Sequence, residues 1–183
     1  MNYTNNKTGY AFLTILLHWL MLIIVAFAYA LMELKSFAPR GSDLRLNMAS
    51  LHYLLGLSVF ALVWVRLALR MTGEVPPIEP NPAIWENVFA KAIHWFFYAF
   101  MIGLPLLGWL ALSAKGNPVH LFFFDLPFLI ATDDALARLL KDLHETLASV
   151  GYFAIGLHAA AALFHHYQKR DNTLRRMLPQ QWR

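Results

Sequence analysis

Apolar residues along the chain gather into four long runs that contain no charged side chain: residues 8–32, 46–65, 92–114 and 146–168. A helix needs roughly 20 apolar residues to cross about 30 Å of hydrocarbon, and each run has about that length. Backbone polar groups in lipid must be paired within their own segment. We therefore expect four transmembrane helices, over about residues 8–33, 46–70, 88–114 and 143–169.

The segments between these runs contain turn and loop signals. Residues 71–82 include four prolines, which favour an extended loop over a helix. Gly116-Asn117-Pro118 predicts a turn, and the apolar run that follows, residues 119–124, is too short to span a membrane. No linker or repeat divides the chain. We expect one domain over residues 1–183, an all-α integral membrane four-helix bundle.

Composition supports a membrane protein and narrows its chemistry. Hydrophobic residues make up 58% of the chain and charged residues 14%, whereas soluble domains have about 25% charged residues. The chain has no cysteine, which excludes disulfides, thiolate metal sites and iron–sulfur clusters. Basic residues flank the apolar runs instead of forming one patch, so no nucleic-acid partner is expected.

The distribution of basic residues predicts the orientation. If both termini lie on one side, nine Lys and Arg residues fall on that side and six on the other. Several of the nine follow the fourth run directly, between Lys169 and Arg176. By the positive-inside rule, we expect both termini in the cytoplasm.

Histidines inside the apolar runs are the candidate functional residues. His144 and His158 are 14 residues apart, so on a helix they leave the same face about 21 Å apart. The expected orientation places His52 beside His144 at the outer level. It places His18 beside His158 at the inner level, with His94 left over there. Ionisable residues at such depths usually face the bundle interior and serve a function.

Paired imidazoles at two depths favour haem ligation. Two imidazoles from different helices saturate a low-spin iron and suit electron transfer, and bundle cores are common cofactor sites. Small residues such as Gly56 and Gly151 would leave flat space for a porphyrin. A proton relay or a transition-metal transporter is the main alternative, and His144, next to Glu145 near the surface, is the weakest ligand by this reasoning.

Several short motifs carry a resemblance to a known family. They are His18-Trp19, Asn47-Met48 before His52, Val65-Arg66 with Arg70, Pro76-Pro77, Gly116-Asn117-Pro118, His144-Glu145-Thr146-Leu147-Ala148, Gly151-Tyr152-Phe153, Ile155-Gly156-Leu157-His158-Ala159-Ala160-Ala161, His165-His166-Tyr167 and Asp171-Asn172-Thr173-Leu174. With them the chain resembles the short bacterial cytochrome b561 family, and most of all its members that oxidise superoxide. Residues 119–141 match that family poorly.

The resemblance implies a protein of the bacterial inner membrane that holds two b-type haems (haem b). The outer haem would be held by His52 and His144, and the inner haem by His18 and His158. The implied reaction oxidises superoxide to oxygen at the periplasmic side and passes electrons through the haems to ubiquinone. The expected partners are these two substrates and the lipid bilayer, with no obligatory protein partner.

Further candidate residues lie at the two ends of the bundle. Basic residues near the outer helix ends are candidates to attract the superoxide anion, or they are ordinary headgroup anchors: Lys35, Arg40, Arg45 and Lys115. His165, about 10 Å beyond His158 on the same helix face, is the first candidate for a quinone contact, and His94 is the second. Arg66 is a candidate partner for a propionate of the inner haem, although it could only set topology.

Two other functions stay open at this point. The chain could be a b-type carrier subunit that links a dehydrogenase or hydrogenase to the quinone pool. It could instead be a non-redox transporter that uses its histidines for a metal ion or for protons. A visible haem spectrum would remove the second alternative.

Overall fold

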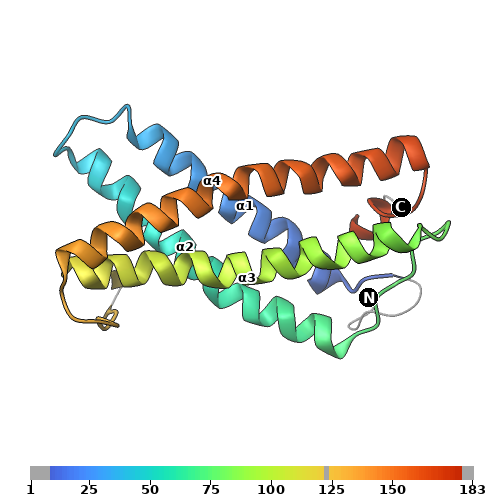
Figure 1. The fold of residues 1–183 in the computed structure, drawn as a ribbon, viewed down its shortest axis with the longest axis horizontal. Helices are drawn as coiled ribbons and strands as arrows, with labels where there is room; N and C mark the ends of the chain where they lie inside the picture. Colours follow the sequence, from blue (N-terminus) through green and yellow to red (C-terminus); the bar gives the residue numbers. More distant parts are fainter. Residues whose placement is uncertain (1–8, 122–123, 179–183) are drawn as a thin grey trace.

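Four long helices form almost all of the computed structural model, which describes residues 9–121 and 124–178 (Figure 1). They are α1 (Phe12–Lys35), α2 (Asp43–Thr72), α3 (Ile84–Lys115) and α4 (Asp134–Phe164). Two-residue strands, β1 (His120–Leu121) and β2 (Phe124–Asp125), pair antiparallel between α3 and α4. A π-helical turn, η1 (His165–Lys169), and a short 3-10 helix, η2 (Arg175–Met177), follow α4. The predicted all-α four-helix architecture is confirmed.

All four helices are long and apolar enough to cross a membrane. Many of their large apolar side chains point outward, which is unfavourable in water: Phe27 is 62% exposed and Phe153 is 81% exposed. Exposed apolar side chains of this kind, present on all four helices, fit a lipid environment. The protein is therefore a multi-pass membrane protein.

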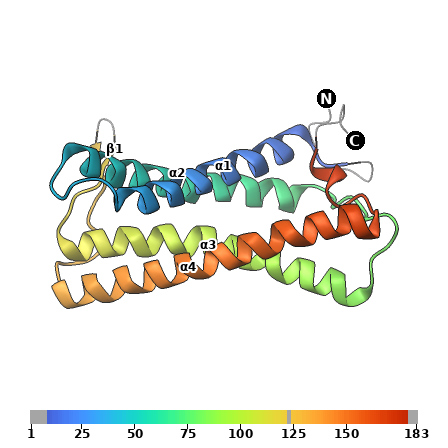
Figure 2. The same cartoon turned by 90° about the horizontal axis from the view of Figure 1, so that it is seen from above.

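The helices pack as two antiparallel pairs, α1 with α2 and α3 with α4 (Figure 2). The buried core where the pairs meet contains Met21 of α1, Val59 and Val63 of α2, and Tyr98 of α3. Because each pair is joined by a short connection, α1 begins and α4 ends at the same end of the bundle. We call this end the terminal end and the other the hairpin end.

The helix bounds differ most from the prediction at the start of α4. The predicted start was residue 143, but the helix begins at Asp134. The added segment is amphipathic and contains charged residues, so a search for charge-free runs does not find it. Its first turn is capped by Asp133, whose side chain accepts hydrogen bonds from the backbone N–H groups of Ala135 (2.8 Å) and Leu136 (3.0 Å). The connection after α3 is correspondingly shorter than predicted.

The connection after α3 packs onto the bundle. Gly116 ends α3 in the left-handed conformation (φ 73°), which its lack of a Cβ allows. Val119 is 5% exposed, and the Trp109 indole donates to the Pro127 carbonyl (3.2 Å). The segment therefore forms a cover over the hairpin end of the bundle.

Candidate haem sites

His52 of α2 and His144 of α4 face each other near the hairpin end, with ring centroids 6.2 Å apart. Each ring donates its Nδ1 proton to a backbone carbonyl of a different helix: His52 to Ala28 of α1 (2.9 Å) and His144 to Leu104 of α3 (3.0 Å). A carbonyl can only accept, so the proton is on Nδ1 in both rings. Nε2 is then the free lone pair, as in most histidines that bind a metal.

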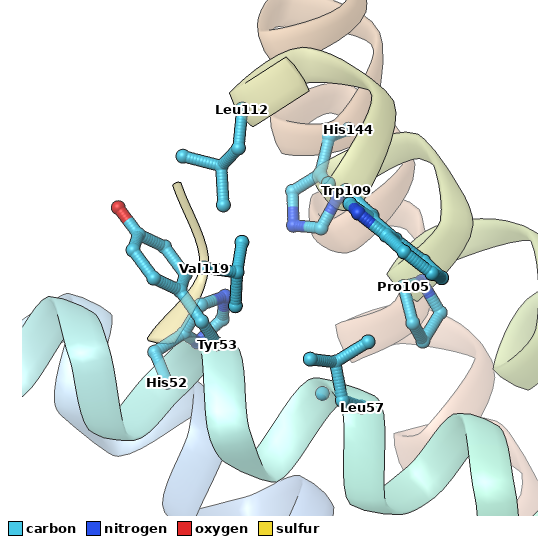
Figure 3. A pocket seen from close by; sticks show the side chains of 10 residues that line it. His52, Tyr53, Leu57, Pro105, Trp109, Leu112, Val119 and His144 are labelled. Atoms are coloured by element: carbon cyan, nitrogen blue, oxygen red, sulfur yellow. The ribbon is translucent and has the colours of Figure 1, made fainter. Parts of the chain in front are cut away.

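A cavity beside this pair is lined by side chains from α2, α3 and α4 that point into a common space (Figure 3). Its walls are mostly apolar, with Leu57, Leu112 and Val119 among them. Gly108 on α3 lets the backbone come close to the His144 ring: a Cβ there would lie 3.3 Å from Cε1. The cavity is therefore a mostly apolar space directly beside two imidazoles.

A second set of imidazoles meets nearer the terminal end. His18 of α1 and His158 of α4 have ring centroids 6.3 Å apart. His94 of α3 is also close, 5.6 Å from His158, and donates its Nδ1 proton to the Ala90 carbonyl (2.5 Å). The predicted inner pair is brought together, and His94, which the sequence left without a partner at this level, lies beside it.

Arg66 of α2 contacts the His18 ring. Its Nη2 donates to His18 Nδ1 (3.1 Å), so His18 carries its proton on Nε2, the opposite tautomer to His52 and His144. Within the described residues, the buried Nη1 of Arg66 has no hydrogen-bond partner. A buried guanidinium donor without an acceptor suits a carboxylate.

The spacing of both pairs fits an iron bound between them. With metal–nitrogen bonds of about 2 Å, an iron between two imidazoles holds the ring centroids about 6 Å apart. The two pairs measure 6.2 and 6.3 Å. Free Nε2 atoms in the outer pair, the apolar cavity and the spare Arg66 donor therefore all fit haem.

The basic residues predicted to attract superoxide have different surroundings. Lys115 pairs with Asp134 (2.6 Å), which cancels its charge locally. Arg45 Nη1 donates to the carbonyls of Lys35 (2.8 Å) and Ala38 (3.1 Å), closing the α1–α2 connection. Arg40 is exposed on the same connection. Three of the four cations, Lys35, Arg40 and Arg45, thus lie in or next to the α1–α2 connection at the hairpin end.

Gly151, midway along α4, does not provide open space for a porphyrin. A Cβ there would lie 2.3 Å from the Tyr29 hydroxyl and 2.5 Å from Cζ of Phe100. Tyr29 also donates to the Ala148 carbonyl (2.8 Å). The glycine is a contact point of α1, α3 and α4, whereas a Cβ at Gly56, in the cavity wall, would meet no atom within 4 Å.

His165 lies in the π-helical turn and pairs with Asp171 (Nδ1 to Oδ2, 2.5 Å). Sequence reasoning missed this partner, because the chain turns back after α4 through Arg170 in the left-handed conformation (φ 56°). It also missed Glu86, a buried carboxylate that accepts from Lys169. The Asp171-Asn172 motif was the only feature of the sequence that indicated a role for Asp171, and that role can be seen only in the three-dimensional structure.

Sequence comparison places this arrangement in a family. The sequence model of prokaryotic cytochrome b561 matches residues 9–180, nearly the whole chain. The chain belongs to the prokaryotic cytochrome b561 family. The resemblance inferred from the motifs is therefore confirmed, and the protein is a membrane b-type cytochrome, which implies b-type haem and a role in electron transport.

Similar proteins span almost the same length. Cytochrome b561 homolog 1 of Escherichia coli (strain K12) is 39% identical over 165 residues, covering 90% of this chain and 94% of that protein. The probable superoxide oxidase CybB of Yersinia pestis is 38% identical over 170 residues, covering 93% and 96%. Cytochrome b561 homolog 2 of E. coli (strain K12) is 29% identical over 180 residues, covering 97% and 95%.

Proposed function

We propose that this protein oxidises superoxide to oxygen and delivers the electrons to ubiquinone through two b-type haems. The observation that carries the proposal is the pair of facing imidazoles at each of two depths, both served by α4. The similarity to a probable superoxide oxidase supports the choice of substrate. In this proposal, residues 1–183 form one di-haem domain in the bacterial inner membrane, with both termini cytoplasmic.

Four histidines would hold the cofactors: His52 and His144 the outer haem, and His18 and His158 the inner haem. When bound, the haems supply one-electron carriers at two depths. The carbonyls of Ala28 and Leu104 fix the outer rings with Nε2 toward the cavity. Two histidine ligands leave an iron no open position, so superoxide would give up its electron without binding the metal.

The inner site requires one rearrangement. If His18 binds iron through Nε2, its proton moves to Nδ1, which can then no longer accept from Arg66. Arg66 would turn toward another acceptor, and a haem propionate is a suitable one. Its unpartnered Nη1 supports this assignment.

At the hairpin end, Lys35, Arg40 and Arg45 would attract the superoxide anion and raise its encounter rate. We assign a smaller contribution to Lys115, because Asp134 neutralises it. At the terminal end, His165 and His94 stay the candidates for contact with the quinone. Two superoxide anions become two oxygen molecules, and one ubiquinone takes up two electrons and two protons.

Stopped-flow spectroscopy tests the proposal. Purified protein mixed with superoxide should show haem reduction well above the dismutation background, and added ubiquinone should reoxidise the haem. If superoxide does not reduce the haem, the protein is instead a carrier subunit that receives electrons from a dehydrogenase or hydrogenase. A preparation without haem absorption bands would favour the transporter alternative.

A further inference from the structure

The His165–Asp171 pair is the most enclosed ionisable pair at the terminal end. The side chains of His165 and Asp171 are 18% and 3% exposed. Burying a carboxylate is expensive unless it is fully hydrogen-bonded. The second oxygen of Asp171, Oδ1, accepts from the Thr173 backbone N–H (2.8 Å). Both oxygens are therefore used, one of them on the imidazole.

The backbone around Asp171 is anchored so that the carboxylate keeps its place. Asp171 N–H donates to the His165 carbonyl (3.2 Å). The next residue, Asn172, exchanges two hydrogen bonds with Glu79 of the proline-rich loop, both of 3.0 Å. Further along, the Trp19 indole of α1 donates to the Met177 carbonyl (2.7 Å). The segment after α4 is thus held against both the loop and α1.

A pocket with polar and charged lining residues opens beside this pair. It lies between the proline-rich loop, the start of α3 and η1, and is lined by Pro80, Asn81, Pro82, Ala83, Glu86, Lys169 and Asp171. The Glu86 carboxylate accepts from Lys169 and from the Ala83 N–H (2.9 Å). Three ionisable groups, Glu86, Lys169 and Asp171, therefore line the pocket, and Asp171 holds His165.

We propose that Asp171 is a positioning residue that holds His165 as the proton donor for quinone reduction. The inference rests on the proposed function and deepens it. Asp171 Oδ2 accepts the Nδ1 proton of His165, which directs the exchangeable proton to Nε2. His165 Nε2–H gives its proton to a quinone carbonyl oxygen as that quinone is reduced, and the neutral ring then takes up another proton from the aqueous side.

The proposed reaction balances without a further reactant. Each superoxide supplies one electron and leaves as oxygen, and two such events reduce one quinone to the quinol. His165 delivers the two protons in turn and recovers each from the aqueous side. Asp171 stays ionised throughout and only orients the ring and stabilises its charged form.

Other charged groups also face the pair. Glu86 and Lys169 approach from α3 and η1 as a neutral pair. Arg176 lies near Asp171 and against the Tyr10 ring, 5.7 Å from its centroid. Asp171 is thus the negative charge in direct contact with His165. Its loss should leave the Nδ1–H of His165 without its acceptor, so that the ring is no longer held in one orientation.

The test uses haem-loaded full-length protein, pre-reduced without oxygen and mixed with a soluble ubiquinone analogue over the range in which histidine titrates, about pH 5–8. Asp171→Asn should slow haem reoxidation about 10-fold or more. Asp171→Glu should recover most of the rate. In a His165→Gln background, Asp171→Asn should have little further effect.

Glu74→Gln is the matched control, because it removes one exposed negative charge near the same end. It should leave the rate of haem reoxidation unchanged. A slow Asp171→Asn rate that Asp171→Glu does not recover, or an effect that adds fully to that of His165→Gln, would overturn the inference. If quinone does not reoxidise the wild-type haem, the proposed acceptor is wrong; wild-type reoxidation with an unchanged Asp171→Asn variant rejects only the positioning role. Haem content and reduction by superoxide report on folding.

Discussion

Gly151 lies between the two α4 ligands, and filling its position with one methyl group should destabilise the bundle. In Gly151→Ala the new Cβ would overlap the Tyr29 hydroxyl (2.3 Å) and Phe100 Cζ (2.5 Å). Overpacking a tight contact costs about 1–3 kcal/mol. If Tyr29 swings away, its hydrogen bond to Ala148 is also lost, at about 1 kcal/mol. We expect a total loss of about 2–4 kcal/mol in the free energy of unfolding.

The assay is thermal unfolding of the purified protein in detergent, monitored through the release of haem. Gly151→Ala should lower the transition by several degrees. Gly103→Ala is the matched control: it makes the same change inside α3, where a Cβ would meet nothing within 4 Å. It should not destabilise the protein.

A second substitution locates the overlap. Tyr29→Phe removes the atom closest to the new Cβ, so it should destabilise the wild-type protein but have a smaller or opposite effect in Gly151→Ala, as coupled neighbours do. If Gly151→Ala is as stable as Gly103→Ala, or if the two substitutions add fully, the close packing of α1 and α4 at this point is refuted.

Three further predictions concern the two ends of the bundle. His158→Ala should lose one of two haems and keep the other, measured as haem per protein; retention of both would refute the pairing. Arg45→Ala should lose two carbonyl contacts, destabilise the α1–α2 connection by about 1–3 kcal/mol and slow reduction by superoxide at low salt; an unchanged rate would remove it from the attracting group. Burial alone would raise the pKa of Asp171, but hydrogen bonds from His165 and Thr173 lower the pKa overall. The ionised Asp171 carboxylate then gives its full stabilisation above the usual aspartate pKa of about 3.9, and this stabilisation is lost as the pH falls through the lowered pKa. Wild type and Asp171→Asn should therefore differ in stability at neutral pH and converge in strong acid.

The sequence was sufficient for the helices and for the main histidine pairs. Charge-free runs of membrane length leave few alternatives to helices, and a 14-residue spacing puts His144 and His158 on one face. These inferences depend on local periodicity and on depth, which the sequence records directly. The start of α4 was predicted too late because an amphipathic, capped turn carries charges.

Contacts between helices could not be obtained in this way. The meaning of Gly151 depends on Tyr29 and Phe100, which come from two other helices. The contact of Arg66 with His18 likewise joins residues 48 positions apart. At the end of α4 the partner of His165 could not be predicted either, because a π-helical turn begins there and the chain folds back to bring Asp171 against it.

Haem stoichiometry in three proteins tests the central claim most directly, because the inner level holds three imidazoles and the account assigns only two of them to iron. Purified wild-type protein should contain two low-spin haems per chain, His18→Ala should contain one, and His94→Ala should keep both. A wild-type ratio of one, or loss of a haem in His94→Ala with both retained in His18→Ala, would contradict the two histidine pairs on which the proposed electron path depends.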